Sequence, residues 1–291
     1  MLPDLRPHTF AFEAIGTGWQ VDTTEPVPPV LRAEIAARIE TFDRTWSRFR
    51  DDSLVSRIAR QPGTWQFPDD APPLFDIYRR LYEATDGAMS PLVGGALESL
   101  GYDRAYSLRP AASPTPVPAW DDAIAWDGSA LTTVSPVSID VGAAGKGYLV
   151  DIVSAMLRAD GHEEFIVDGS GDIRQLGAAP IRVALEHPLD TTKAIGIATV
   201  HNGSICSSAT NRRTWGDGLH HVIDALTGLP TNRVIATWAI AHTGLEADGL
   251  ATALFFAEPA RLALQFEFTW VRMFSNGTVE FSPHLDGEIF T

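Results

Sequence analysis

The sequence has 291 residues, of which 45% are hydrophobic and 20% charged, and these fractions are typical of a folded globular protein. Its formal net charge of −15 disfavours nucleic acid or an anionic membrane as the main partner. A single cysteine, Cys206, excludes an intramolecular disulfide, and its position between Ile205 and Ser207 predicts a small buried side chain.

The first residues contain no apolar core of the kind found in signal peptides, and no stretch of about 18 apolar residues occurs in the sequence. No cysteine near the start offers a site for lipid attachment. We therefore expect a cytoplasmic protein without a membrane span. Removal of a leader would leave the same pattern.

Residues 8–23 alternate between apolar and polar side chains, which predicts a β-strand with Gly16 and Gly18 at a bend or bulge. A change to helical spacing follows, with two prolines in front of it where a helix tolerates them. The apolar positions of this predicted helix are Leu31, Ile35, Ile39, Phe42, Trp46 and Phe49. Such a stripe is typical of core packing. Asp52 or Ser53 is placed to cap a short helix after it.

The segment 72–91 predicts a second amphipathic helix that ends at Gly87. Residues 109–120 are rich in proline and small side chains and predict a surface loop. The second half alternates short β-type runs with two helical segments, 147–159 and 245–257. This unequal alternation indicates a protein of mixed α and β structure and argues against a regular βαβ repeat.

The stretch SIDVGAAGKGYLVDIV, residues 138–153, has the outline of a phosphate-binding loop. It is not a Walker A motif, because Asp140 stands where the first glycine is needed and Gly147 where Ser or Thr is needed. The dinucleotide pattern G-x-G-x-x-G fails too, since Val150 takes the last position. Lys146 still stands near a helix N-terminus, which favours an anion. The alternative is a tight turn with a solvated lysine.

Two further segments carry candidate functional side chains. Asp248 and Thr252 are spaced i, i+4 on a predicted helix, and their oxygens are ligands of the kind that Mg²⁺ prefers. His220 and His221 are adjacent in a β-type run, so at most one of them faces a given site and acts there as a base. An ordinary helix threonine and a packed or exposed histidine remain the alternatives.

Six segments follow one another along the chain: FDRTWSRFRDDSLVSRI (42–58), DGAMSPLVGGALESLGYD (86–103), SIDVGAAGKGYLVD (138–151), VDGSGDIRQLG (167–177), HHVIDALTGLP (220–230) and LEADGLATALFF (245–256). Taken in this order they resemble the ApbE family of FAD:protein FMN transferases, and the resemblance covers roughly residues 10–257. It implies one domain formed by residues 1–291. The sequence departs from the family pattern at Ser90, where the family has Asp, and at Ala209, where glycine is common.

The resemblance implies an α+β, T-fold-like domain with mixed or antiparallel sheets flanked by helices. It also implies Mg²⁺-dependent cleavage of FAD, transfer of FMN to a Thr or Ser hydroxyl of an acceptor flavoprotein, and release of AMP. By position, the implied metal ligands are the Ala143 carbonyl, Asp248 and Thr252, and the implied catalytic residues are His221, as base, and Asp248. The implied FAD contacts are Met89, Ser90, Asp140, Lys146 and Ile223. The segment 85–103, a loop with several glycines that enters a helix, by itself predicts that Met89 and Ser90 lie on an exposed corner. An FAD pyrophosphatase and a non-catalytic flavin-binding protein are the alternative functions.

Overall fold

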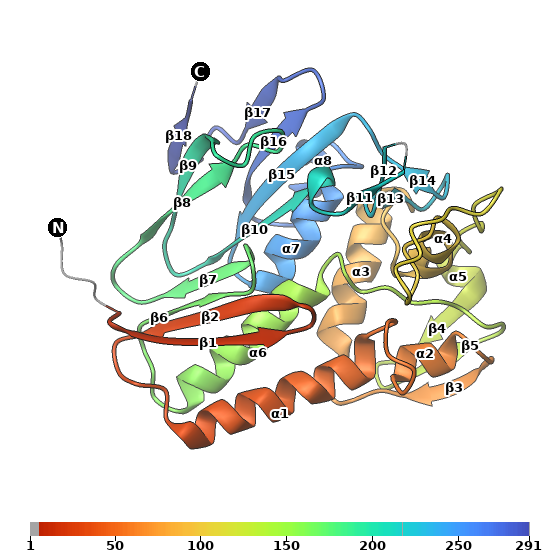
Figure 1. The fold of residues 1–291 in the computed structure, drawn as a ribbon, viewed down its shortest axis with the longest axis horizontal. Coiled ribbons are helices and arrows are strands. Elements are labelled where there is room, and N and C mark those ends of the chain that lie inside the picture. Colours follow the sequence, from red (N-terminus) through yellow and green to blue (C-terminus); the bar gives the residue numbers. More distant parts are fainter. Residues whose placement is uncertain (1–5, 217, 291) are drawn as a thin grey trace.

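The structure is a computed structural model that describes residues 6–216 and 218–290 (Figure 1). Its main feature is an antiparallel sheet of eight strands in the order β1-β2-β6-β7-β10-β15-β16-β17. The strands are β1 (His8–Ala14), β2 (Thr17–Thr23), β6 (Phe165–Asp168), β7 (Ile173–Leu176), β10 (Ser204–Ala209), β15 (Val234–Ala241), β16 (Thr269–Phe274) and β17 (Val279–Phe281). β1 and β17 form the two borders of this sheet.

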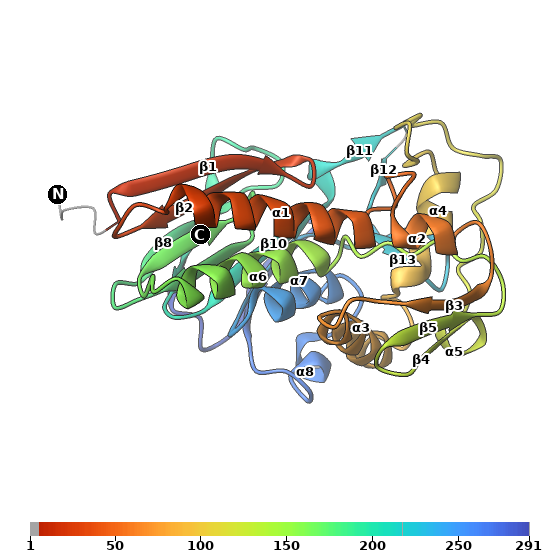
Figure 2. The ribbon, with the colours of Figure 1, turned by 90° about the horizontal axis from the view of Figure 1, so that it is seen from below.

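Helices cover one face of the sheet and a small second sheet lies against the other (Figures 1 and 2). The helices are α1 (Pro29–Trp46), α3 (Pro72–Ala84), α6 (Gly145–Ala159) and α7 (Gly244–Ala253). The second sheet has the order β18-β9-β8, formed by β18 (Gly287–Ile289), β9 (Ala194–Val200) and β8 (Ile181–Glu186). Neighbouring side chains of β10 serve the two faces, because Ile205 packs in the core between the sheets and Cys206 in the core under the helices.

Shorter elements complete the fold at the side of α3. A three-stranded sheet has the order β3-β5-β4, and two hairpins pair β11 with β12 and β13 with β14. The bounds are α2 (Leu54–Ile58), β3 (Gly63–Gln66), η1 (Pro91–Val93), α4 (Gly94–Ser99), α5 (Trp120–Ala123), β4 (Ile124–Trp126), β5 (Ala130–Thr133), η2 (Thr210–Arg212), β11 (Thr214–Trp215), β12 (Leu219–His220), β13 (Ile223–Asp224), β14 (Leu229–Pro230) and α8 (Pro259–Leu262).

The α+β class, with antiparallel sheets flanked by helices, is confirmed. The apolar stripe of α1 packs into the core, Ser53 caps α2, and Cys206 is fully buried, all as predicted. The loop 109–120 is mostly exposed, except that Trp120 is buried and begins α5. Among the described residues, no helix combines the length and the apolar character needed to span a bilayer.

The single strand predicted over residues 8–23 is wrong, because this segment is a hairpin of β1 and β2. The chain reverses at Ile15 and Gly16, where φ is +44° and +78°. The alternation of apolar and polar residues continues from β1 into β2, so the pattern gave no sign of the turn between them. A positive φ at Ile15 is strained for a β-branched side chain, and no sequence signal at a non-glycine residue announces it. The tip of this hairpin faces the functional site.

Candidate functional site

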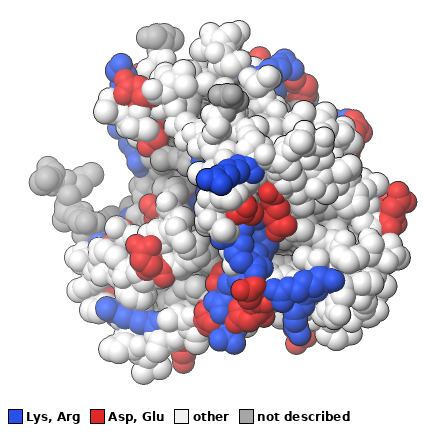
Figure 3. Space-filling model, turned by 45° about the vertical axis from the view of Figure 1, so that its right-hand side comes forward, with Lys and Arg blue, Asp and Glu red and all other residues white. Residues whose placement is uncertain are grey.

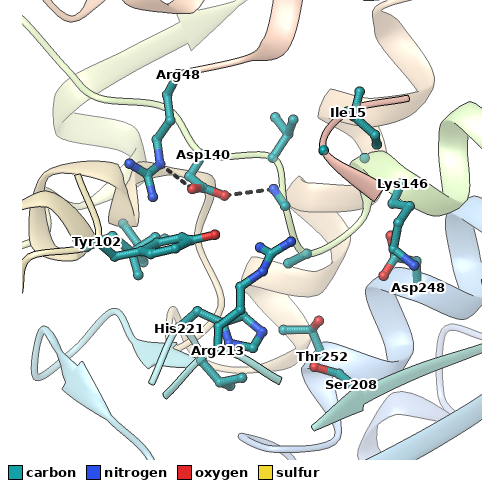
Figure 4. A pocket seen from close by; sticks show the side chains of 18 of the residues that line it. Ile15, Arg48, Tyr102, Asp140, Lys146, Ser208, Arg213, His221, Asp248 and Thr252 are labelled. Atoms are coloured by element: carbon teal, nitrogen blue, oxygen red, sulfur yellow. Dashed lines mark hydrogen bonds and ion pairs between the residues drawn. The ribbon is translucent and has the colours of Figure 1, made fainter. Parts of the chain in front are cut away.

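One cavity of about 770 Å³ brings together the ends of several elements (Figure 4). It lies among the β1–β2 turn, the end of α1, the start of α6, β10, the 221–223 segment and α7. The nine candidate residues predicted from the sequence all line it, and they are Met89, Ser90, Asp140, Ala143, Lys146, His221, Ile223, Asp248 and Thr252. Tertiary structure therefore gathers into one place residues that the sequence separates by more than a hundred positions.

Contact between two backbones positions the carboxylate of Asp248. The N–H of Gly147 in α6 donates to Asp248 Oδ2 at 2.9 Å. A Cβ added at Gly147 would lie 2.1 Å from the carbonyl oxygen of Gly244, so only glycine permits α6 and α7 to approach this closely. At the start of α7, Asp151 accepts hydrogen bonds from the N–H groups of Gly244 and Leu245, both at 2.8 Å. These contacts fix where α7 presents Asp248 and Thr252.

Beside Asp248 lies a buried ion pair. Lys146 Nζ is 2.7 Å from Asp172 Oδ2 and also donates to the Gly169 carbonyl at 2.8 Å. Burial lowers the pKa of Lys146, but the charges of Asp172 and Asp248 outweigh burial and the net pKa is raised. Burial raises the pKa of Asp248 well above its usual value, and the charge of Asp172 raises it further, against the opposing effect of Lys146.

This cluster has the character of a cation site. Asp172 is fully buried, and apart from the approach of Lys146 its two oxygens receive no well-directed hydrogen bond from the described residues. Two carboxylates therefore face one ammonium group. Because burial and then the charge of Asp172 raise the pKa of Asp248, a cation bound beside it would stabilise its ionised form. Among the described residues no group of three or more His, Cys, Asp or Glu side chains is arranged to hold a metal. The Asp248 carboxylate, the Thr252 hydroxyl and the Ala143 carbonyl are nevertheless oxygen donors of the kind that Mg²⁺ prefers, and all three residues line the cavity.

Ala143, whose carbonyl the resemblance suggests as a metal ligand, is positioned by a residue of α3. Its N–H donates to the hydroxyl oxygen of Tyr78 at 3.2 Å. Tyr78 is 2% exposed, so its hydroxyl is sequestered from water. Burial raises the pKa of Tyr78 well above its usual value, and the nearby charges of Asp140 and Asp248 add to this effect. Sequence reasoning placed Tyr78 only in an apolar helix face, because its partner is distant along the chain.

Asp140 lies on another wall of the cavity and is paired with Arg48 (Figure 4). Arg48 Nε donates to Asp140 Oδ2 at 2.5 Å, and the Gly142 N–H donates to Oδ1 at 2.7 Å. Burial raises the pKa of Asp140, but the charge and hydrogen bond of Arg48 and the Gly142 N–H lower it below its usual value. The carboxylate is thus ionised and occupied by protein partners.

Arg48 was not identified from the sequence, although it is only 5% exposed and lines the cavity. Its guanidinium carbon lies 4.2 Å from the ring centre of Phe49 and 5.0 Å from that of Tyr102. Its two terminal nitrogens make no hydrogen bond to the described residues. An arginine next to an aromatic residue is too common in sequences to have indicated that Arg48 lines the cavity and pairs with Asp140.

The two adjacent histidines have separate roles. His220 is held by backbone on both ring nitrogens, with Nε2 2.6 Å from the Thr231 carbonyl and Nδ1 accepting from the Val222 N–H at 3.3 Å. His221 faces the cavity, and its Nδ1 is buried without a partner among the described residues. Burial lowers the pKa of His221 to about 4, with help from the charges of Arg213 and His220. His221 is therefore neutral at pH 7.

The prediction that Met89 and Ser90 form an exposed corner is wrong, because they are only 2% and 5% exposed. Ser90 Oγ accepts from the Leu92 N–H at 3.2 Å and caps η1. Asp and Ser are both good caps, so Ser90 keeps a structural role that an aspartate would also fill. Ile223 is likewise buried and presents one side to the cavity.

Charges around the cavity are largely paired despite the net charge of −15. Figure 3 shows basic and acidic side chains intermingled on one face of the molecule. Next to the cavity, Arg50 pairs with Glu40, Asp43 and Asp52 at 2.9–3.0 Å. The side chains that line the cavity itself include four basic ones, Arg48, Arg50, Lys146 and Arg213, and three acidic ones, Asp43, Asp140 and Asp248. The acidic character of the protein as a whole therefore does not carry over to the lining of the cavity.

Known proteins resemble this chain in sequence and in fold. The model of the ApbE family matches residues 15–267. A protein of Klebsiella pneumoniae (strain 342) named FAD:protein FMN transferase is 26% identical over 282 residues, which are 86% of this chain and 78% of the relative. The flavin transferase ApbE of Vibrio cholerae has a similar fold, with a TM-score of 0.76, 24% identity and coverage of 94% of this chain and 96% of that one. The ApbE protein of Thermotoga maritima gives a TM-score of 0.81 at 23% identity, with the same coverages of 94% and 96%.

Proposed function

The chain belongs to the ApbE family, and from this we propose that it is a Mg²⁺-dependent FAD:protein FMN transferase. The observation that supports this most is that a neutral histidine, His221, and a buried carboxylate, Asp248, line one cavity together with the seven other predicted residues. A volume of about 770 Å³ lies within the range of pockets that enclose a cofactor.

In the proposed reaction, a Thr or Ser hydroxyl oxygen of an acceptor flavoprotein forms a bond to the phosphorus of the FMN half of FAD. The bond from that phosphorus to the bridging oxygen breaks, and AMP leaves with that oxygen. The hydroxyl proton passes to His221, whose ring is unprotonated at neutral pH because its pKa is about 4. The acceptor thereby carries FMN through a phosphodiester.

The Ala143 carbonyl, Asp248 and Thr252 are the residues proposed to hold Mg²⁺. When bound there, the ion would supply neutralisation of the pyrophosphate charge. Lys146 contributes a fixed positive charge on the same side of the cavity, while Asp172 keeps it ionised. Met89, Ser90, Asp140 and Ile223 are proposed to form the walls that bind FAD, with Arg48 holding the Asp140 carboxylate.

The experiment uses as acceptor a flavoprotein from the organism that encodes this protein, one that carries FMN on a threonine when mature. The acceptor is produced flavin-free in a host without a flavin transferase. Incubation with enzyme, FAD and Mg²⁺ should give a fluorescent acceptor band and one AMP per FMN transferred, and EDTA should abolish both. AMP release without a labelled acceptor would indicate a pyrophosphatase instead. Tight, metal-independent FAD binding without turnover would indicate a binding protein.

A matched pair of variants tests the base. His221→Asn should lower the transfer rate about 10²–10⁴-fold, the usual contribution of a general base, while FAD still binds. The neighbouring His220→Asn should instead lower stability, because its ring bonds the backbone on both sides. Equal activity of the two variants would contradict the assignment of His221.

A further inference from the structure

A second, smaller hollow of about 260 Å³ runs between β1 and α1, outside the cavity described above. Its floor is apolar and formed by side chains from both elements, namely Phe10, Phe12, Ile35, Ala36 and Ile39. Its rim carries polar side chains, namely Glu13, Arg32, Glu40 and Asp43. We call it the β1–α1 groove. None of the proposed steps of FAD binding or metal binding uses it.

One side of this groove is the free border of the main sheet. Within the described residues β1 pairs only with β2, so its outer edge has no partner strand (Figure 2). The backbone N–H and C=O groups along such an edge are a template for an added strand. Phe10 and Phe12 are only partly buried, which leaves apolar surface beside that edge. The groove therefore offers both backbone hydrogen bonds and apolar contact to an extended chain.

One end of the β1–α1 groove lies next to the cavity. Ile15 and Asp43 line both hollows, so the groove and the cavity adjoin each other at these two residues. β1 and α1 both run toward this junction (Figure 2). At the other end, Arg32 is tied to the Val27 carbonyl at 2.8 Å, and its guanidinium carbon lies 4.8 Å from the Phe10 ring centre. Arg32 thus covers the floor at the far end.

We propose that the β1–α1 groove binds an extended segment of the acceptor protein as an added strand on β1, and so delivers its Thr or Ser hydroxyl to the cavity at Ile15. This inference rests on the proposed function, in which one substrate is a protein. FAD is accommodated by the larger cavity, whereas a protein substrate needs a surface that continues out of it. Alternate apolar side chains of the segment would face Phe12 and Ala36, with polar ones between them facing water.

Blocking the groove tests the proposal with a matched control on the same helix. Ala36 is exposed and lines the groove, whereas Ala37 is exposed but does not line it. With the flavin-free acceptor described above as probe, Ala36→Trp should raise the acceptor KM at least tenfold. The Kd for FAD and kcat at saturating acceptor should not change, and Ala37→Trp should behave as wild type.

Strand addition itself has a separate readout. Amide hydrogen exchange in residues 8–14 should slow at least tenfold when the acceptor binds, while exchange in β17, at the opposite border, stays the same. Unchanged exchange in 8–14 at saturating acceptor would overturn strand addition, and an unaltered acceptor KM in Ala36→Trp would overturn the groove as docking site. If wild type labels no acceptor, the proposed function itself fails, which distinguishes the two hypotheses.

Discussion

Gly147 in α6 and Asp248 in α7 are joined by a 2.9 Å hydrogen bond from a backbone N–H to a carboxylate oxygen, at a point where the helix backbones nearly touch. This contact lets a helix N-terminus orient a buried acid from another helix. Gly147, the second glycine of the AGKG turn (144–147), therefore serves both the packing of α6 against α7 and the orientation of the Asp248 carboxylate.

Gly147→Ala should therefore be strongly destabilising. Its Cβ would lie 2.1 Å from the Gly244 carbonyl oxygen and 2.6 Å from Asp248 Cβ, and the backbone oxygen has no cheap way to move. Overpacking of this kind costs about 1–3 kcal/mol, measured by chemical denaturation. Gly95→Ala is the control, because the nearest atom to its Cβ is 3.6 Å away and stability should not fall. Equal stability of the two variants would mean that α6 and α7 do not pack this closely.

Removing the charge of Lys146 should affect stability and activity differently in single and double variants. Lys146→Met leaves Asp172 buried without its cation, which costs about 3 kcal/mol or more for a buried pair. Lys146→Met combined with Asp172→Asn should recover much of that stability but no transfer activity. Denaturation midpoints and acceptor labelling measure the two effects. Recovery of activity in the double variant would show that Lys146 serves only the fold.

Tyr78→Phe tests how α3 supports the proposed metal site. The variant leaves the Ala143 N–H without its acceptor in a buried place, a loss of about 1–3 kcal/mol of stability. We also expect weaker Mg²⁺ binding, measured by titration of the enzyme with Mg²⁺ or Mn²⁺, since Ala143 is proposed as a ligand. Tyr82→Phe is the matched control, because its hydroxyl makes only a 3.4 Å contact with the Trp120 N–H. If Tyr78→Phe binds the ion like wild type, its hydroxyl does not position Ala143.

The pH dependence should reflect the neutral state of His221. Its pKa in the folded protein is about 4, below the 6.5 of an unperturbed histidine. The kcat/KM for FAD should thus show no His-dependent fall between pH 7 and 5 and should drop only toward pH 4.

Stability gives an independent check on the same group. Because the folded pKa of His221 is depressed, the unfolded state binds the proton more readily, and wild type should lose stability relative to His221→Asn as pH falls from about 6.5 to 4. Above pH 6.5 the difference between the two proteins should be constant. An activity profile with a midpoint near 6.5 would show that His221 is solvated in the working enzyme.

Local periodicity was enough to predict some elements. α1 and α3 followed from apolar spacing, and α1 also from the prolines in front of it, because these signals act within a few residues of each other. The same reasoning joined β1 and β2 into one strand, because a turn at Ile15 depends on a strained φ that the neighbouring sheet imposes. Some helices end a few residues from the predicted position. The sequence predicted a helical segment over 245–257, whereas α7 ends at Ala253.

By itself, the sequence determined the class of the fold, the family and nine of the residues that line the cavity, because ordered motifs and periodic patterns are properties of the chain. Only the tertiary structure decided the state of those residues. Asp140 forms an ion pair with Arg48, Lys146 forms an ion pair with Asp172, and His221 is neutral at pH 7. Each of these depends on burial and on a partner far along the chain, and charge and pKa respond to distance in space rather than in sequence.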